Sequence, residues 1–208
     1  MTASVVERTA LAADLVKLVI RTDWEQPHQA GQYLQLWLPG YEGAHYFSIA
    51  SAPSDFPEVT LLVRIGSSAL DQAIAGLRPN DAVNLSSPNG RFRASPTGDS
   101  LFFIGGGTGI APMLSMVLDL AAQGETRPLR LIYGYRHERE CGFDEELAAL
   151  EASGVQVQRI IGAPITLDES LLDGQAPAGH ICGPPAMIEA LQAQAKALGL
   201  SPLLTEPY

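Results

Sequence analysis

A glycine-rich loop, GGGTG at positions 105–109, joins an apolar segment to a predicted helix that contains Pro112 in its first turn. Glycine allows a sharp turn and a close approach of the backbone to a ligand. The N–H groups and the dipole at a helix start favour a pyrophosphate group. The spacing differs from G-x-G-x-x-G, and a strand-to-helix turn without a ligand is the alternative. The candidate phosphate-binding residues are Gly106, Gly107, Thr108 and Gly109.

A second loop, CGPP at positions 182–185, follows another predicted strand, and its two prolines make it stiff. Ligands of open parallel sheets bind beyond the carboxyl ends of the strands. We therefore expect Cys182 and Gly105 to line the same edge of a sheet. The alternative is that Cys182 is a small buried hydrophobic residue.

The elements that position these loops fall into two parts, predicted as domains at residues 1–95 and 96–208. In the first part, short apolar runs at 16–20, 33–38, 59–65 and 82–85 alternate with turn residues, which indicates an antiparallel barrel or sandwich. A helix is expected at 68–76. Beyond a linker at 93–100, predicted strands (101–104, 129–135, 155–161, 179–182) alternate with helices (110–123, 143–152, 186–198). This alternation indicates βαβ units and a parallel sheet.

The two loops together, GGGTGIAP followed about 70 residues later by CGPP-x-M, resemble the ferredoxin–NADP reductase superfamily, which includes NAD(P)H:flavin oxidoreductases. The resemblance covers nearly the whole chain. It implies an N-terminal flavin-binding β-barrel and a C-terminal Rossmann-like domain that binds NADH or NADPH. It also implies that Cys182, Gly183 and Pro184 lie beside the nicotinamide.

The resemblance implies a flavin motif, Arg-x-aromatic-Ser, which the segment HYFSI at 45–49 matches after GQY at 31–33. Phe47 would pack against the flavin and Ser48 would hydrogen-bond near its reactive nitrogen. An aromatic ring offers a flat apolar face, and a hydroxyl can donate or accept. Ser48 and Cys182 are the candidate catalytic residues, and their role is to position and polarise the flavin and the nicotinamide. The candidate flavin-binding residues of this strand are His45, Tyr46, Phe47, Ser48 and Ile49.

His45 departs from the family pattern, because arginine usually binds the flavin phosphate there. Histidine is largely neutral at pH 7 and lacks the guanidinium fork. Three alternatives follow: weak or FMN-like binding, flavin as a diffusing substrate, or a strand residue whose role other groups, such as Arg64, have taken over. The family's second phosphate contact corresponds to Gly66, Ser67 and Ser68. The alternative there is a serine N-cap.

Three further residues are assigned by position. Arg136 follows a predicted strand end, where a cation would favour NADPH, but the choice between NADH and NADPH stays open. Solvated surface is the alternative for Arg136. By resemblance, Tyr208 covers the flavin face, unless it is a frayed tail, and Glu206 lies near the active site.

The composition limits the partners. Of 208 residues, 46% are hydrophobic and 17% charged, which indicates a sizeable core. The net charge of -10 disfavours nucleic acid and anionic membranes. Two cysteines without a C-x-x-C pair indicate no metal site and no iron–sulfur cluster within this chain. The sequence shows no signal-peptide pattern and no long apolar stretch, so a cytoplasmic location is expected.

The leading functional hypothesis is a reductase that transfers a hydride from NAD(P)H to FAD or FMN, bound or diffusible. The flavin and nicotinamide supply the redox chemistry, and no side chain needs to act as a strong acid or base. One alternative is a flavin-containing reductase component that passes electrons to a separate ferredoxin or oxygenase protein. Another is a non-catalytic nicotinamide-binding module.

Overall fold

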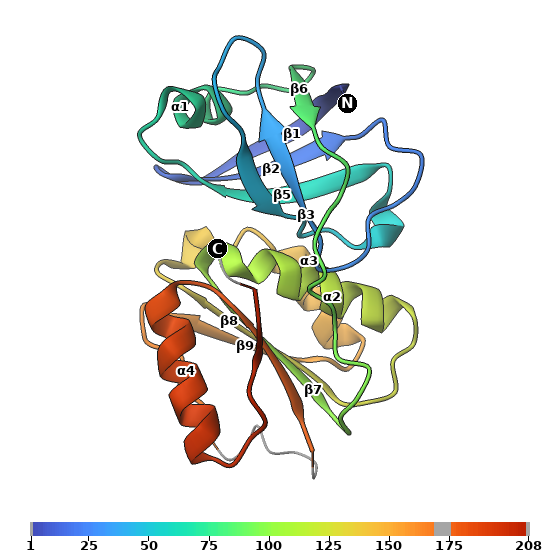
Figure 1. Cartoon of the computed structure of the whole chain (residues 1–208), viewed down its shortest axis with the longest axis vertical. Helices are drawn as coiled ribbons and strands as arrows, with labels where there is room; N and C mark the ends of the chain where they lie inside the picture. Colours follow the sequence, from blue (N-terminus) through green and yellow to red (C-terminus); the bar gives the residue numbers. More distant parts are fainter. Residues whose placement is uncertain (1, 169–175, 207–208) are drawn as a thin grey trace.

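The computed structural model describes residues 2–168 and 176–206, so the predicted role of Tyr208 lies outside the described residues. The chain forms two parts, each built around its own sheet (Figure 1). The N-terminal part carries a six-stranded antiparallel sheet and the C-terminal part a five-stranded parallel sheet. Both fold classes were predicted from the sequence, and the two-domain fold is confirmed.

The antiparallel sheet has the strand order β4-β3-β6-β1-β2-β5. An antiparallel backbone bridge joins Ile49, the residue after β4, to Leu61 of β5, so the two outer strands meet and the sheet closes as a barrel. Helix α1 caps one side of it. The bounds are β1 Thr2–Ala12, β2 Leu15–Arg21, β3 Tyr33–Trp37, β4 His45–Ser48, β5 Glu58–Arg64, α1 Ala69–Ala75 and β6 Ala82–Leu85, with a 3-10 turn at Pro53–Asp55.

The barrel interior follows from alternation along the strands. In β2 the side chains of Leu18 and Ile20 are fully buried, and in β3 those of Leu34 and Leu36 are. Successive side chains of a strand point to opposite faces, so these residues meet inside the barrel. The sequence did not predict β1, because Glu7 and Arg8 and two register shifts interrupt its apolar alternation.

The parallel sheet has the order β11-β10-β7-β8-β9. Its bounds are β7 Leu101–Gly106, α2 Ile110–Ala122, β8 Leu129–Tyr135, α3 Asp144–Ala152, β9 Gln156–Ile161, β10 Ala178–Cys182, α4 Pro185–Ala197 and β11 Leu204–Thr205, with 3-10 turns at Gly107–Gly109 and Glu138–Glu140. Most predicted elements match within two residues. The two-residue strand β11 was not predicted, because so short a run has no periodicity.

Helices cover both faces of the parallel sheet, as Figure 1 shows. Phe103 of β7 packs in a core with α2 and α3, whereas Phe102 and Ile104 pack with α4. Strands buried on both faces read as continuous apolar runs, which explains the sequence LFFI at 101–104.

Helix α2 also connects the two parts, because it lies on the side of the parallel sheet that faces the barrel (Figure 1). Its Ser115 hydroxyl donates a 2.7 Å hydrogen bond to the carbonyl of Ser51 in the barrel part. Leu15 and Leu62 of the barrel share one buried core with α2. No helix within residues 2–168 and 176–206 combines the length and apolarity that crossing a bilayer requires.

Candidate functional site

Two cavities lie at the junction of the barrel and the parallel sheet. The first, of about 520 Å³ and here called the barrel cavity, is lined by Tyr33, Tyr46, Phe47, Ser48, Leu62, Arg64, Thr108, Ala111 and Glu206. The second, of about 1000 Å³ and here called the sheet cavity, lies over the carboxyl ends of β7, β8 and β10. Arg64 and Thr108 line both cavities, so the two spaces meet at these residues.

Strand β4 delivers the predicted aromatic–serine motif to the barrel cavity. Antiparallel pairing places Tyr33 opposite Ser48, and the rings of Tyr33 and Tyr46 contact each other edge to face at 5.8 Å. Tyr46 is 64% exposed, which is unusual for a large aromatic side chain. Of the predicted flavin residues, Tyr46, Phe47 and Ser48 therefore line this cavity. Ile49 is fully buried in the barrel core instead.

The glycine loop and the cysteine loop are in direct contact at one edge of the parallel sheet, and the sequence predicted that both line the same edge. Cys182, the last residue of β10, pairs in register with Gly105, which is the residue before the last one of β7. A Cβ atom added to Gly109 would overlap the carbonyl group of Cys182 and approach the backbone nitrogen of Gly183 to 2.7 Å. Glycine is therefore required at position 109 by close packing. Gly107, with a φ of 56°, has the left-handed conformation that favours glycine.

The sheet cavity brings together most of the remaining predicted nucleotide residues. Gly106, Gly107, Thr108, Arg136 and Pro184 all line it. Gly109 and Cys182 do not line this cavity, and Cys182 is only 2% exposed. Its Sγ atom donates to the carbonyl oxygen of Glu206 at 3.8 Å, so the end of the described chain reaches the cysteine loop.

Glu206 lies at the barrel cavity, as predicted for a residue near the site. Burial raises the pKa of its carboxyl group, and the positive charge of Arg93 offsets this only in part. Within the described part of the chain, its buried Oε2 atom has no hydrogen-bond partner. Burial of this kind disfavours the charged form of a carboxyl group, which is the direction of the shift at Glu206.

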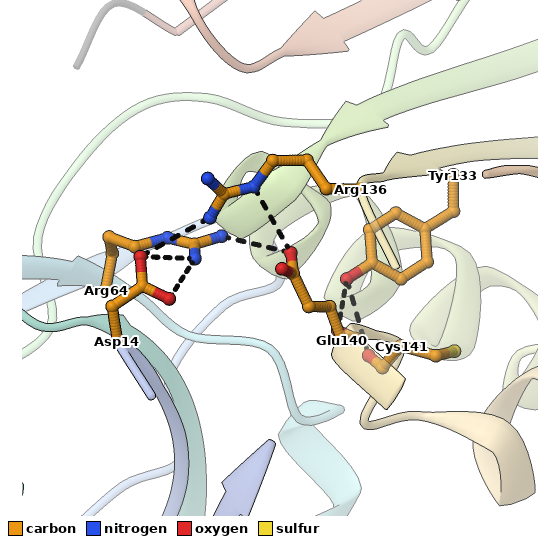
Figure 2. A network of polar contacts seen from close by, with 6 residues as sticks. All are labelled: Asp14, Arg64, Tyr133, Arg136, Glu140 and Cys141. Atoms are coloured by element: carbon orange, nitrogen blue, oxygen red, sulfur yellow. Dashed lines mark hydrogen bonds and ion pairs between the residues drawn. The ribbon is translucent and has the colours of Figure 1, made fainter. Parts of the chain in front are cut away.

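A network of four charged side chains spans the junction (Figure 2). Arg64, at the end of β5, binds both carboxylate oxygens of Asp14 at 2.9 and 3.0 Å, and its Nη2 atom lies 3.4 Å from Glu140 Oε2. Arg136 contacts the same two acids, at 3.4 Å to Asp14 and 3.6 Å to Glu140. Asp14 and Arg64 belong to the barrel, and Arg136 and Glu140 to the parallel-sheet part. The network therefore ties the two parts together beside both cavities.

Strand β8 fixes the position of Glu140 in this network. The hydroxyl of Tyr133 donates to the backbone carbonyls of Glu140 at 3.4 Å and Cys141 at 3.3 Å, as Figure 2 shows. The Glu140 side chain is only 3% exposed. Partial desolvation acts to raise the pKa of Asp14, but its hydrogen bonds and charge interactions with Arg64 and Arg136 outweigh this and lower it.

Sequence reasoning missed Asp14 and Glu140. Asp14 lies in the two-residue turn between β1 and β2, and Glu140 lies among several surface charges in HERE, 137–140. No local pattern distinguishes either residue, because their partner Arg64 is 50 and 76 residues away. Arg64 itself was considered as a replacement cation, and its position at both cavities agrees with a role in the site.

The predicted phosphate turn, residues 66–68, is the N-terminus of α1. Ser68 is the N-cap and accepts a hydrogen bond from the backbone nitrogen of Asp71 at 3.0 Å. In return, Asp71 Oδ2 accepts from the Ser68 hydroxyl at 2.6 Å and from its backbone nitrogen at 3.0 Å. His45 Nε2 lies 3.1 Å from Asp71 Oδ1. Hydrogen bonds from Ser68 are the main cause that lowers the pKa of Asp71.

A closed antiparallel barrel followed by a parallel sheet, with a ligand-sized cavity at each and a glycine loop at their junction, defines a two-domain nucleotide-binding protein. Comparisons with known proteins narrow this class. Residues 103–193 match the family model of the oxidoreductase NAD-binding domain. The reductase component DmpP of phenol 2-monooxygenase from Pseudomonas sp. (strain CF600) is 38% identical over 201 residues, which is 86% of this chain and 57% of that protein.

Two solved structures have the same two-part architecture over 99% of this chain. The cytochrome P450 reductase GcoB from Amycolatopsis is 26% identical, with a TM-score of 0.84 over 68% of its length. A ferredoxin NADP+ reductase from Neisseria gonorrhoeae, solved with FAD and NADP, is 18% identical, with a TM-score of 0.81 over 97% of its length. Residues 103–193 therefore belong to the oxidoreductase NAD-binding domain family, and the whole chain has the fold of a ferredoxin NADP+ reductase. The chain spans little more than half the length of the DmpP relative.

Proposed function

We propose that this chain is a flavin-dependent oxidoreductase that transfers a hydride from NADH or NADPH to flavin. The observation that carries the proposal is the meeting of the barrel cavity and the sheet cavity at Arg64 and Thr108. Two bound ligands whose reactive parts reach this point would be adjacent. Both cavities have volumes typical of small-molecule sites.

The barrel cavity fits the ring system of a flavin. Tyr33, Tyr46 and Phe47 offer aromatic surface, and Leu62 and Ala111 offer aliphatic surface. We assign the Ser48 hydroxyl to hydrogen bonding with the ring, because it is a donor or acceptor on the lining. When bound, flavin supplies the redox chemistry.

The sheet cavity fits a nicotinamide dinucleotide. We assign the pyrophosphate to the backbone of Gly106, Gly107 and Thr108 at the start of α2, because the N–H groups and dipole of a helix start favour anions. Gly109 brings the cysteine loop close, and we assign Cys182 and its neighbours to the nicotinamide end. Arg136 offers positive charge on the same lining.

The protein's own residues would bind, orient and exclude water in this scheme. Glu206, which lines the barrel cavity and whose buried Oε2 atom has no hydrogen-bond partner among the described residues, would offer a polar group to the flavin site. Arg64 would present positive charge where the two ligands approach each other. We place the domain boundary near residue 95, where the Ser95 N–H donates to His180 Nε2 at 2.9 Å.

The second candidate is a reductase component that passes electrons to a separate ferredoxin or oxygenase protein. The similarity to the phenol 2-monooxygenase reductase component supports it. For either function we propose a cytoplasmic location, which suits two cysteines that are not joined in a disulfide.

The visible spectrum of the purified protein tests the proposal, followed by anaerobic addition of NADH or NADPH with and without FMN, FAD or riboflavin. A colourless protein that reduces added flavin over many turnovers supports the flavin reductase. A yellow protein that bleaches by itself supports the reductase component. If no flavin is bound or reduced under any condition, the oxidoreductase assignment is wrong.

A further inference from the structure

The carboxylate of Asp71 occupies the place that the family resemblance gives to a flavin phosphate. Its Oδ2 atom accepts from both the hydroxyl and the backbone N–H of Ser68, and its Oδ1 atom lies 3.1 Å from His45 Nε2. Residue 45 and the turn at 66–68 are the two positions at which the family resemblance implies contacts with the flavin phosphate. Both are engaged by one acidic side chain of the protein itself.

A phosphate that approached this point would meet a negative charge instead of open donors. Like charges at hydrogen-bonding distance repel strongly, and the hydrogen bonds to Asp71 would first have to break. Displacing Asp71 would also remove the side-chain half of the capping box at the start of α1. The position is therefore built to hold a carboxylate, and it does not fit a phosphate.

The surroundings supply little positive charge to compensate. A groove of about 550 Å³ adjoins His45 and Ser68, and its lining residues include Glu42 but no lysine or arginine. Arg64 lies at the barrel cavity, where Asp14 and Glu140 bind it. Strand β4 runs from this groove to the barrel cavity, because His45 lines the former and Tyr46, Phe47 and Ser48 line the latter.

We propose that the protein recognises flavin through its ring system and sugar-alcohol chain in the barrel cavity and makes no favourable contact with the phosphate. Riboflavin, FMN and FAD are then ligands of similar affinity, and flavin behaves as a diffusible substrate. The inference rests on the proposed function, since it concerns the same cavity.

Binding titrations without nicotinamide test this inference. Riboflavin, FMN and FAD are each titrated with the purified protein, and the quenching of flavin fluorescence gives three dissociation constants. We expect the three values to agree within about threefold, because a phosphate left in solvent contributes little to affinity. Binding of FMN or FAD at least tenfold tighter than riboflavin would overturn the inference, as would FAD that stays bound through gel filtration.

Two variants test whether Asp71 is the cause. Asp71→Asn removes the charge but keeps an acceptor for Ser68, and His45→Arg supplies the guanidinium that the family usually has. Each should make FMN bind about tenfold tighter relative to riboflavin, the effect of about one hydrogen bond to a charged group. If both variants fold and the ratio of the dissociation constants for FMN and riboflavin is unchanged in each, Asp71 does not exclude the phosphate.

Asp55→Asn is the matched control. Asp55 also accepts a hydrogen bond from a backbone N–H at a helix start in the barrel part, because its Oδ2 accepts from Ala52 N at 3.1 Å, but it lines neither the barrel cavity nor the groove. In this variant, the ratio of the dissociation constants for FMN and riboflavin should equal that of the unmodified protein. If none of the three flavins binds at all, the proposed function itself is wrong. If the flavins bind but FMN and FAD bind much more tightly than riboflavin, only the inference about the phosphate is wrong.

Discussion

Replacing Glu140 with glutamine tests how strongly the charge network holds the two parts together. The Glu140 side chain is only 3% exposed and lies within 3.4 Å of Arg64 and 3.6 Å of Arg136. Glutamine keeps the shape of the side chain and removes its charge. Two arginines would then lose a buried partner while the surrounding packing stays nearly the same.

The expected cost follows from distance and exposure. Opposite unit charges about 4 Å apart interact with about 4 kcal/mol at an effective dielectric constant of 20. Desolvation opposes this, and Arg64 and Arg136 keep 31% and 62% of their side chains exposed. We therefore expect Glu140→Gln to lower the free energy of unfolding by about 2 kcal/mol, below the roughly 3–5 kcal/mol of fully buried pairs.

A double-mutant cycle isolates the interaction between Arg64 and Glu140. Urea unfolding of the unmodified protein, Arg64→Met, Glu140→Gln and the double variant gives the coupling energy, which we expect to be about 1–2 kcal/mol. Far-ultraviolet circular dichroism follows both parts. Tryptophan fluorescence follows the barrel part, where both tryptophans, Trp24 and Trp37, lie.

The pair Arg21–Glu58 provides a matched control. Its atoms are closer, at 2.7 Å, but the side chains are 61% and 32% exposed. Exposed pairs contribute only about 0.2–1 kcal/mol, so this cycle should give the smaller coupling energy. A coupling energy for Arg64–Glu140 no larger than that for Arg21–Glu58 would refute the reasoning that burial strengthens the network.

Three other residues give further predictions. Ser48→Ala should slow flavin reduction about tenfold, with little change in nicotinamide affinity, because one hydrogen bond to the ring is lost; stopped-flow absorbance measures this, and an unchanged rate contradicts the role. Gly109→Ala should weaken nicotinamide binding at least tenfold in calorimetry, because its Cβ has no space; Gly76→Ala, where a Cβ fits at 3.5 Å, should bind normally. Burial lowers the pKa of His180 to about 4, so the folded state binds fewer protons than the unfolded state between about pH 4 and 6.5. Stability should therefore fall by up to about 3 kcal/mol as the pH drops through that range. His180→Gln, which keeps an acceptor for the Ser95 N–H, should flatten this dependence in urea titrations; an equally steep loss in the variant would assign the effect to other groups.

The sequence predicted the fold because its local signals agree with the tertiary structure. Apolar alternation identified four barrel strands, and continuous apolar runs identified the buried parallel strands. It did not identify β1, where Glu7 and Arg8 lie on a long, irregular strand, or β11, which spans two residues. Strand β1 pairs with the adjacent β2 through two register shifts and with the distant β6, and β11 pairs with β10. An irregular register and so short a strand leave no regular apolar alternation in the sequence.

In the candidate site too, the sequence identified residues that lie in local motifs and missed residues whose partners are distant in the sequence. Residues on contiguous motifs could be proposed from the sequence, and the structure brings most of them to the cavities: Tyr46, Phe47 and Ser48 to the barrel cavity, and Gly106, Gly107 and Thr108 to the sheet cavity. The acids Asp71 and Glu140, which pair with His45 and with Arg64, were not proposed, because neither lies in a sequence motif. Only the folded chain brings Asp71 to His45 and Glu140 to Arg64.

These two acids affect anion binding in different ways. Asp71 holds donors of its own domain, and the hydrogen bonds that it makes are within or beside one short helix. Glu140 holds Arg64 across the domain junction, so an anionic ligand in the sheet cavity that attracts Arg64 competes with a contact that also stabilises the assembly. We therefore expect binding at the sheet cavity to be coupled to the domain junction, and we expect rejection of a phosphate at Asp71 to remain local to the barrel.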